Sequence, residues 1–340
     1  MLRAQGNLAE ALTANRASYA IFERLGKTDT GNTEWQRDLS VAHGRIGDVV
    51  RAQGNLSEAL TAYKASLAIG ERLAKADPGN AGWQRDLAVA RNFVGDVYLA
   101  QGKLAEALTE YRGYNEIIDR LAKADPGNAG WQHDLGISQG KVAEVLEAQG
   151  ELAGALDGYR RTLAIQKRLA KAYPGNAGWQ RDLSVAHNKI GDVLTGQGNL
   201  AEAATAYKAS HAIISHLAKA DPGNAGWQYD LSVSHNKMGN VLVGQGNFPD
   251  ALAAYKSSLT IRERLAKTDP ENTDWQRDFA ISHGRVAVVL AQQGKRAQAL
   301  AAFRKGRDII SKLKAAVSSH LTLPKDLVWF DGQIRALEKR

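Results

Sequence analysis

Apolar side chains recur along the chain at the spacing of amphipathic helices. Over residues 81–100 they follow one another at steps of four and three, at Trp83, Leu87, Ala90, Val94 and Val97. Residues 56–76 carry a second stripe, at Leu56, Ala59, Leu60, Tyr63, Leu67 and Leu73. This spacing places each set on one face of a helix. The two stripes therefore predict two consecutive helices, each about 30 Å long.

The polar segments between the stripes carry residues that end and begin helices. A glycine such as Gly54 follows each predicted first helix, where it supplies the positive φ angle of a helix C-terminus. Asparagine is a favoured N-cap residue because its side-chain oxygen accepts a hydrogen bond from a free backbone N–H. We expect N-caps at Asn55, Asn80 and Asn199, the first and last with a glutamate three residues on as in a capping box.

The helix pair is repeated with a period of 48 residues. Six tryptophans stand at this interval, at Trp35, Trp83, Trp131, Trp179, Trp227 and Trp275. Each is followed by glutamine, and aspartate lies three residues after each. Residues 179–200 and 227–248 are identical at 16 of 22 positions. Because one helix pair cannot bury its own apolar stripe, the sequence predicts a linear stack of such units.

The segment from Val94 to Tyr111 resembles the tetratricopeptide repeat. The family's small residue, aromatic residue and turn glycine fall on Gly95, Tyr98 and Gly102, and its second-helix alanine and aromatic residue fall on Ala107 and Tyr111. The resemblance extends over nearly the whole chain. The usual period is about 34 residues, so the 48-residue unit is most like the long-repeat bacterial proteins of this family and, more distantly, kinesin light chains.

The resemblance implies an all-α, right-handed solenoid of stacked antiparallel helix pairs, whose first helices line a concave groove for a partner peptide or domain. We expect one domain over residues 1–340: a lone second helix in a truncated repeat at 1–34, six repeats at 35–322 and a capping helix at 323–340. The truncated start predicts self-association through this edge, or a sensor or docking role in a larger signalling polypeptide with an upstream effector domain.

Helical spacing on the first helices identifies candidate partner-binding residues. They are Asp48, Arg85, Asn92, Asp96, Glu144, Arg181, Asn188, Asp192, Asn236 and Asn240. The resemblance implies that the asparagines clamp a peptide backbone, since an amide both donates and accepts hydrogen bonds. The acidic column favours a partner with basic residues. The alternative is that cations three residues away neutralise it, as in Arg45/Asp48, Lys141/Glu144 and Lys189/Asp192.

Two further columns are interpreted as structural. Each tryptophan of the 48-residue series is expected to plug the joint between successive repeats, since a large apolar ring on the apolar stripe packs there. A histidine row runs through His43, His187, His235 and His283. We expect no metal at this row, because stacked helices lie about 8–10 Å apart and Arg91 interrupts it.

Composition narrows the functional classes. Without cysteine, the chain has no disulfide framework, thiol nucleophile or thiolate metal site. No apolar run approaches the roughly 18 residues that span a bilayer, and the start lacks a secretory signal, so we expect a cytoplasmic protein. Phosphate-loop, dinucleotide, metalloprotease and hydrolase motifs are missing, so we expect no enzyme activity and no cofactor.

The net charge of +8 is concentrated at the C-terminal end. Residues 295–340 contain 11 Lys and Arg against 4 Asp and Glu, whereas residues 1–294 contain 33 against 32. The basic patch comprises Lys295, Arg296, Arg304, Lys305, Arg307, Lys312 and Lys314. The sequence thus predicts a non-catalytic scaffold for a protein or peptide partner, with nucleic acid or another anionic partner at the basic end as the alternative.

Overall fold

A computed structural model describes residues 8–316 and 322–339, and within these residues the regular structure is helical throughout, without strands. The chain forms two compact units, residues 1–169 and 170–340. The first unit contains α1 (Leu8–Thr28), α2 (Thr33–Ala52), α3 (Leu56–Ala76), α4 (Ala81–Ala100), α5 (Leu104–Ala124), α6 (Ala129–Ala148) and most of α7 (Leu152–Ala172). The second contains α8 (Ala177–Gly196), α9 (Leu200–Ala220), α10 (Ala225–Gly244), α11 (Phe248–Thr268), α12 (Thr273–Gln292), α13 (Arg296–Ala316) and α14 (Leu323–Glu338).

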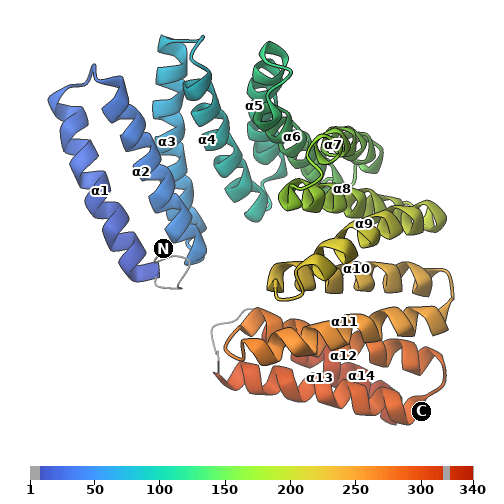
Figure 1. Cartoon of the computed structure of the whole chain (residues 1–340). Coiled ribbons are helices and arrows are strands. Elements are labelled where there is room, and N and C mark those ends of the chain that lie inside the picture. Colours follow the sequence, from blue (N-terminus) through green and yellow to red (C-terminus); the bar gives the residue numbers. More distant parts are fainter. Residues whose placement is uncertain (1–7, 317–321, 340) are drawn as a thin grey trace. The chain divides into compact units, whose positions relative to one another are not determined.

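Consecutive helices within each unit pack as antiparallel neighbours (Figure 1). In the first unit α2 packs on α3 and α4 on α5, and α3 and α5 each also contact the helix that follows. In the second unit α8/α9, α10/α11 and α12/α13 form the same pairs. We call the even-numbered helices first helices and the odd-numbered ones second helices. The predicted ranges 56–76 and 81–100 are confirmed as α3 and α4, and the fold is an all-α solenoid of stacked helix pairs.

Each first helix from α2 to α12 begins with the same capping contact. The side-chain oxygen of an asparagine accepts the backbone N–H of the repeat tryptophan at 3.1 Å, which confirms the predicted cap at Asn80. The next residue, glutamine, donates to a carbonyl near the end of the preceding second helix, as Gln84 does to Ala74 at 3.1 Å. This bond satisfies a carbonyl that the helix itself leaves free. The Trp-Gln pair therefore ties one repeat to the next.

The caps of the second helices vary. The predicted capping box is confirmed at Asn55, whose side chain accepts the backbone N–H of Glu58 at 3.2 Å and donates to its carboxylate at 2.9 Å. The box predicted at Asn199 is wrong, because that side chain makes no capping bond. The predicted positive φ angle is confirmed at Gly54 and at the five equivalent glycines from Gly102 to Gly294.

A buried tyrosine of the second helix packs on a glycine of the first helix. At Gly95 a Cβ atom would lie 2.7 Å from the ring of Tyr111, so glycine is required for the ring to approach this closely. Gly47, Gly191 and Gly239 receive Tyr63, Tyr207 and Tyr255 in the same way. Each hydroxyl donates at 2.7 Å to the residue after the glycine, as Tyr111 does to Asp96. The tyrosine ring and its hydrogen bond hold the two helices of one repeat together.

The end of the second unit is closed by α14. Leu323 and Phe330 are fully buried there, together with Phe303 and Ile310 of α13. A helix at the predicted cap is therefore present from Leu323 to Glu338. At the other end, the predicted lone second helix corresponds to α1, and residues 1–7 before it lie outside the described residues.

Candidate functional site

The first helices are linked near their N-termini by an Arg–Asp ladder. An arginine two residues after the tryptophan pairs with the aspartate 49 residues later, on the next first helix. The pairs are Arg37–Asp86 at 2.5 Å and Arg85–Asp134 at 3.0 Å in the first unit, and Arg181–Asp230 and Arg277–Asp326 (2.6 Å) in the second. The hydrogen bond to Asp326 raises the pKa of Arg277. Arg85 and Arg181, predicted as groove residues, are thus engaged between repeats.

A second ladder crosses the same helices about two to three turns further on. Lys141 contacts Asp96 at 2.8 Å in the first unit, and Lys237 contacts Asp192 at 2.6 Å in the second. The partner lies 45 residues away, on the preceding first helix. The predicted local pair of Lys141 and Glu144 is present but longer, at 3.7 Å. We call this the Lys–Asp ladder, and it balances the charge of Asp96 and Asp192 within the chain.

An apolar column lies between the two ladders. Its members are Val41, Val89 and Ile137 in the first unit and Val185, Val233, Ile281 and Trp329 in the second. Each stands four residues after a position of the Arg–Asp ladder, so it shares that face of its helix. None is buried, and Val41 and Val185 are each 41% exposed. In each unit, we call this column with its flanking ladders the first-helix face. The candidate residues chosen from the sequence are all polar or charged, so none of them belongs to this column.

The predicted asparagine column lies beside this face. The carbonyl oxygens of Asn92, Asn188 and Asn236 are buried, and no hydrogen-bond partner reaches them from the described residues. Asn236 is only 6% exposed, so it presents little surface to a partner. Asn240, by contrast, is exposed and accepts hydrogen bonds from Tyr255 and Arg285. The structure therefore separates the predicted asparagines into three inward-facing residues and one member of the Lys–Asp ladder.

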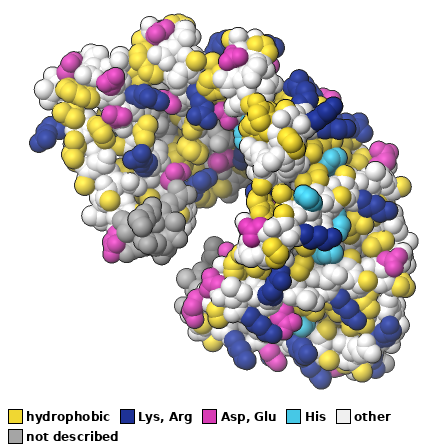
Figure 2. Space-filling model, viewed as in Figure 1, with side chains coloured by type: hydrophobic (Ala, Val, Ile, Leu, Met, Phe, Trp, Pro, Cys, Tyr) yellow, Lys and Arg dark blue, Asp and Glu magenta, His cyan; other side chains and the backbone are white. Residues whose placement is uncertain are grey.

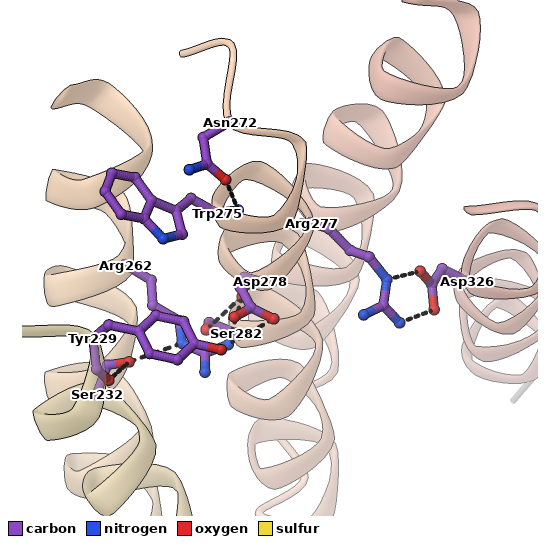
Figure 3. Close-up of polar contacts among 9 residues, drawn as sticks. All are labelled: Tyr229, Ser232, Arg262, Asn272, Trp275, Arg277, Asp278, Ser282 and Asp326. Atoms are coloured by element: carbon purple, nitrogen blue, oxygen red, sulfur yellow. Dashed lines mark hydrogen bonds and ion pairs between the residues drawn. The ribbon is translucent and has the colours of Figure 1, made fainter. Parts of the chain in front are cut away.

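The Arg–Asp ladder changes partners at Tyr229, which stands where four of the six repeats have arginine (Figure 3). Asp278 instead meets Arg262, which reaches it from α11 with an N–O distance of 3.3 Å. Arg262 also donates to the Ser232 hydroxyl at 3.1 Å and lies over the Tyr229 ring. The side chain is buried, and this burial lowers the pKa of Arg262 while Asp278 raises it. The neighbouring rung, Arg277 with Asp326, keeps the usual partners (Figure 3).

The tryptophans of the repeat are partly buried in all six positions. The guanidinium of Arg85 lies over the ring of Trp131, 5.8 Å from its centroid. The histidine row contacts aromatic rings: His43 meets Tyr19, and His235 meets His211 at 4.8 Å between ring centroids. The described part of the chain contains no group of three or more side chains placed to hold a metal ion.

The basic C-terminal patch is partly neutralised by α14. Arg304 pairs with Glu338 at 2.7 Å, and Arg307 pairs with Asp331 at 2.6 Å. Figure 2 shows Lys and Arg side chains interspersed with Asp and Glu over the last helices of the second unit. The remaining lysines of α13 in the predicted patch are Lys305, Lys312 and Lys314. Two of the seven cations of the patch are therefore paired with carboxylates of α14.

Comparisons with known proteins match this architecture. A family model described as tetratricopeptide repeat matches residues 234–271. No curated protein matches the sequence. Among the described residues, no helix is both long enough and apolar enough to cross a membrane.

Solved structures share the fold at low sequence identity. BtubC (BKLC) from P. vanneervenii is 17% identical, with 76% of this chain and 92% of that chain covered and a TM-score of 0.59. The apo form of RapI is 14% identical, with 90% and 77% covered and a TM-score of 0.60. A putative kinesin light chain with TPR-like repeats from Podosopora anserina is 18% identical, with 68% and 95% covered and a TM-score of 0.46. At these identities, the first two likenesses show a shared fold.

Proposed function

We propose that this chain, which is a tetratricopeptide-repeat protein, is a non-catalytic scaffold that binds a partner peptide or domain on its first-helix face. The observation that supports this most strongly is the partly exposed apolar column between two ladders of paired charges. Apolar surface that stays in contact with water favours association with a partner, while the paired charges on either side of it orient that partner. The binding residues are repeated along the helices, as an extended partner requires.

The ladders change the kind of partner we propose. Asp96 and Asp192 already have a lysine within 2.8 Å and a tyrosine hydroxyl at 2.7 Å. Their charge is therefore balanced, and a basic partner would have to displace an existing cation. Affinity comes mainly from apolar side chains that cover the column.

Val185→Asp tests this proposal. Val185 is 41% exposed, so an aspartate there places a charge in the apolar column without opening the core. Affinity-tagged wild-type chain and variant are compared for capture of partners from lysate, with quantification by mass spectrometry. We expect the captured partners to fall by about tenfold or more, as for a residue near the centre of an interface.

Thr205→Asp is the matched control. Thr205 is an exposed residue of α9, a second helix, and its substitution adds the same charge away from the first-helix face. Circular dichroism establishes that both variants keep the wild-type helicity. Equal capture by Val185→Asp and wild type, or equal losses in the two variants, would contradict the assignment of this face.

A further inference from the structure

The Lys–Asp ladder loses its carboxylate at its last rung. Asn240 stands where the preceding repeat has Asp192, and Val288 follows in the same column. Arg285 donates to the Asn240 side-chain oxygen at 2.9 Å, and the Tyr255 hydroxyl donates to that same oxygen at 2.7 Å. The uncharged side-chain amide of Asn240 thus accepts a hydrogen bond from the charged guanidinium of Arg285. Within residues 8–316 and 322–339 Arg285 forms no ion pair, and its buried Nε atom has no acceptor.

A pocket of about 340 Å³ opens beside this guanidinium, within the second unit. Val243 of α10, Ile281 and Val288 of α12 and Trp329 of α14 supply apolar lining, and Arg285 supplies the cation. Asp326 also lines the pocket, but it accepts two hydrogen bonds from Arg277, at 2.6 and 3.0 Å, so its charge is balanced. Trp329 is 39% exposed. The pocket is therefore apolar, open to solvent and marked by one unpaired cation.

The position of Trp329 depends on a glycine of α12. A Cβ atom at Gly284 would lie 2.7 Å from the Trp329 ring, so glycine makes room for the indole. In the preceding repeat the same position holds Asn236, a larger residue. Asn240, Gly284 and Val288 together replace a charged rung by an apolar pocket with an unpaired arginine.

We propose that this pocket binds a segment of the partner protein that presents an aliphatic side chain next to a carboxylate. The aliphatic group covers Val243, Val288 and the Trp329 ring, and the carboxylate accepts hydrogen bonds from Arg285. A guanidinium can bind a carboxylate with two parallel hydrogen bonds. The volume lies at the lower end of the range for ligand pockets, as suits one side chain. This inference rests on the proposed scaffold function and specifies the partner for one part of it.

The test uses two capped tetrapeptides, acetyl-Gly-Leu-Asp-Gly-amide and acetyl-Gly-Leu-Asn-Gly-amide, with the full chain. The readout is the indole N–H resonance of Trp329, assigned with Trp329→Phe, during titration with each peptide. We expect the aspartyl peptide to bind about tenfold more tightly, since a charged hydrogen bond is gained only with the carboxylate. We expect Arg285→Lys to retain a preference and Arg285→Gln to lose it.

Asn240→Asp is the decisive variant. It places a carboxylate where Asp192 stands in the preceding repeat, so Arg285 gains an internal partner and Tyr255 keeps an acceptor. We expect this variant to fold as the wild type does and to bind the two peptides equally. Equal binding by the wild type, a preference that survives in Asn240→Asp, or an unmoved Trp329 resonance would overturn the proposal. So would movement that follows protein concentration alone, which would identify a second copy of the chain as the occupant.

The outcome is separable from that of the scaffold proposal. Val185 lies on α8 and does not line this pocket. Loss of partner capture in Val185→Asp, with no discrimination between the peptides, would keep the scaffold and remove the pocket. Discrimination between the peptides together with full capture by Val185→Asp would keep the pocket and remove the wider binding face.

Discussion

The exchange of partners at Asp278 predicts that Tyr229 and Arg262 are energetically coupled. In repeats whose ladder arginine is present, the position of Arg262 holds Gly70, Ile118, Ile214 and Ile310. The position is polar in the two repeats that lack this arginine: Gln166 accompanies His133, and Arg262 accompanies Tyr229. In the repeat of Tyr229, Arg262 therefore supplies from α11 the cation that the ladder lacks.

The structure gives the magnitude for Arg262→Ile. Arg262 is 7% exposed and donates to Ser232 and to the Asp278 carbonyl at 3.1 and 3.2 Å. Its removal leaves the Asp278 carboxylate, 20% exposed, without its cation. Breaking a buried pair in this way costs about 3–5 kcal/mol, whereas a buried isoleucine contributes about 1.5–3 kcal/mol. We expect a net loss of roughly 2 kcal/mol in the free energy of unfolding.

The effect of the second substitution, Tyr229→Arg, on stability depends on whether Arg262 is present. Alone it brings another guanidinium close to Arg262 and destabilises the chain by about 1 kcal/mol or more, through repulsion between like charges. Combined with Arg262→Ile, it restores the arrangement of the preceding repeat, where Arg181 pairs with Asp230 and Ile214 is buried. We expect the double variant to be as stable as wild type or more stable by about 1 kcal/mol, because replacing a buried ion pair by apolar packing is often favourable.

The assay is a double-mutant cycle by urea denaturation, followed by circular dichroism. Hydrogen exchange of α10, α11 and α12 locates the effect, because stacked repeats open locally. The control is Ile214→Arg, which buries a cation where Asp230 is already paired and should cost several kcal/mol. A coupling energy within about 0.5 kcal/mol of zero would refute the compensation, since independent sites add to that precision.

Two further predictions concern packing and pH. Gly47→Ala should destabilise the chain by about 1–3 kcal/mol, because its Cβ would lie 2.6 Å from the buried Tyr63 ring. In the control Gly44→Ala, in the same helix, the Cβ meets nothing within 4 Å, so this variant should be more stable than wild type by roughly 0.5–1 kcal/mol. Equal melting temperatures would contradict this. Burial, together with nearby His211, lowers the pKa of His235 from 6.5 to about 4. The unfolded chain therefore binds more protons in this interval, so stability should fall as pH drops from about 6.5 towards 4. His235→Gln should flatten that dependence, and an unchanged pH profile of denaturation would oppose it.

The helices could be predicted from the sequence because their signals are local. Asparagine caps, turn glycines and apolar spacing fixed the ranges of α3 and α4, as the structure has them. The ladders could not be predicted from the same signals, because their partners are 45 and 49 residues apart in the sequence. Lys141 had a local carboxylate available in Glu144, but stacking brings Asp96 closer, at 2.8 instead of 3.7 Å. The packing of the repeats determines which residues of adjacent first helices meet. The sequence of a single helix does not specify these contacts.

Near-identical repeats give little information where they agree, since copying preserves a residue whether or not it acts. Their differences are informative, and the structure separates these into two kinds. At Tyr229 the lost cation is restored by Arg262, so the ion pair of Asp278 is maintained within the chain. At Asn240 no described residue restores the carboxylate to Arg285, and the loss coincides with an open apolar pocket. A change that is compensated within the chain needs no ligand, whereas an uncompensated charge at the surface of a pocket is stabilised by binding one. The asymmetry required for specific recognition therefore lies where α10, α12 and α14 meet.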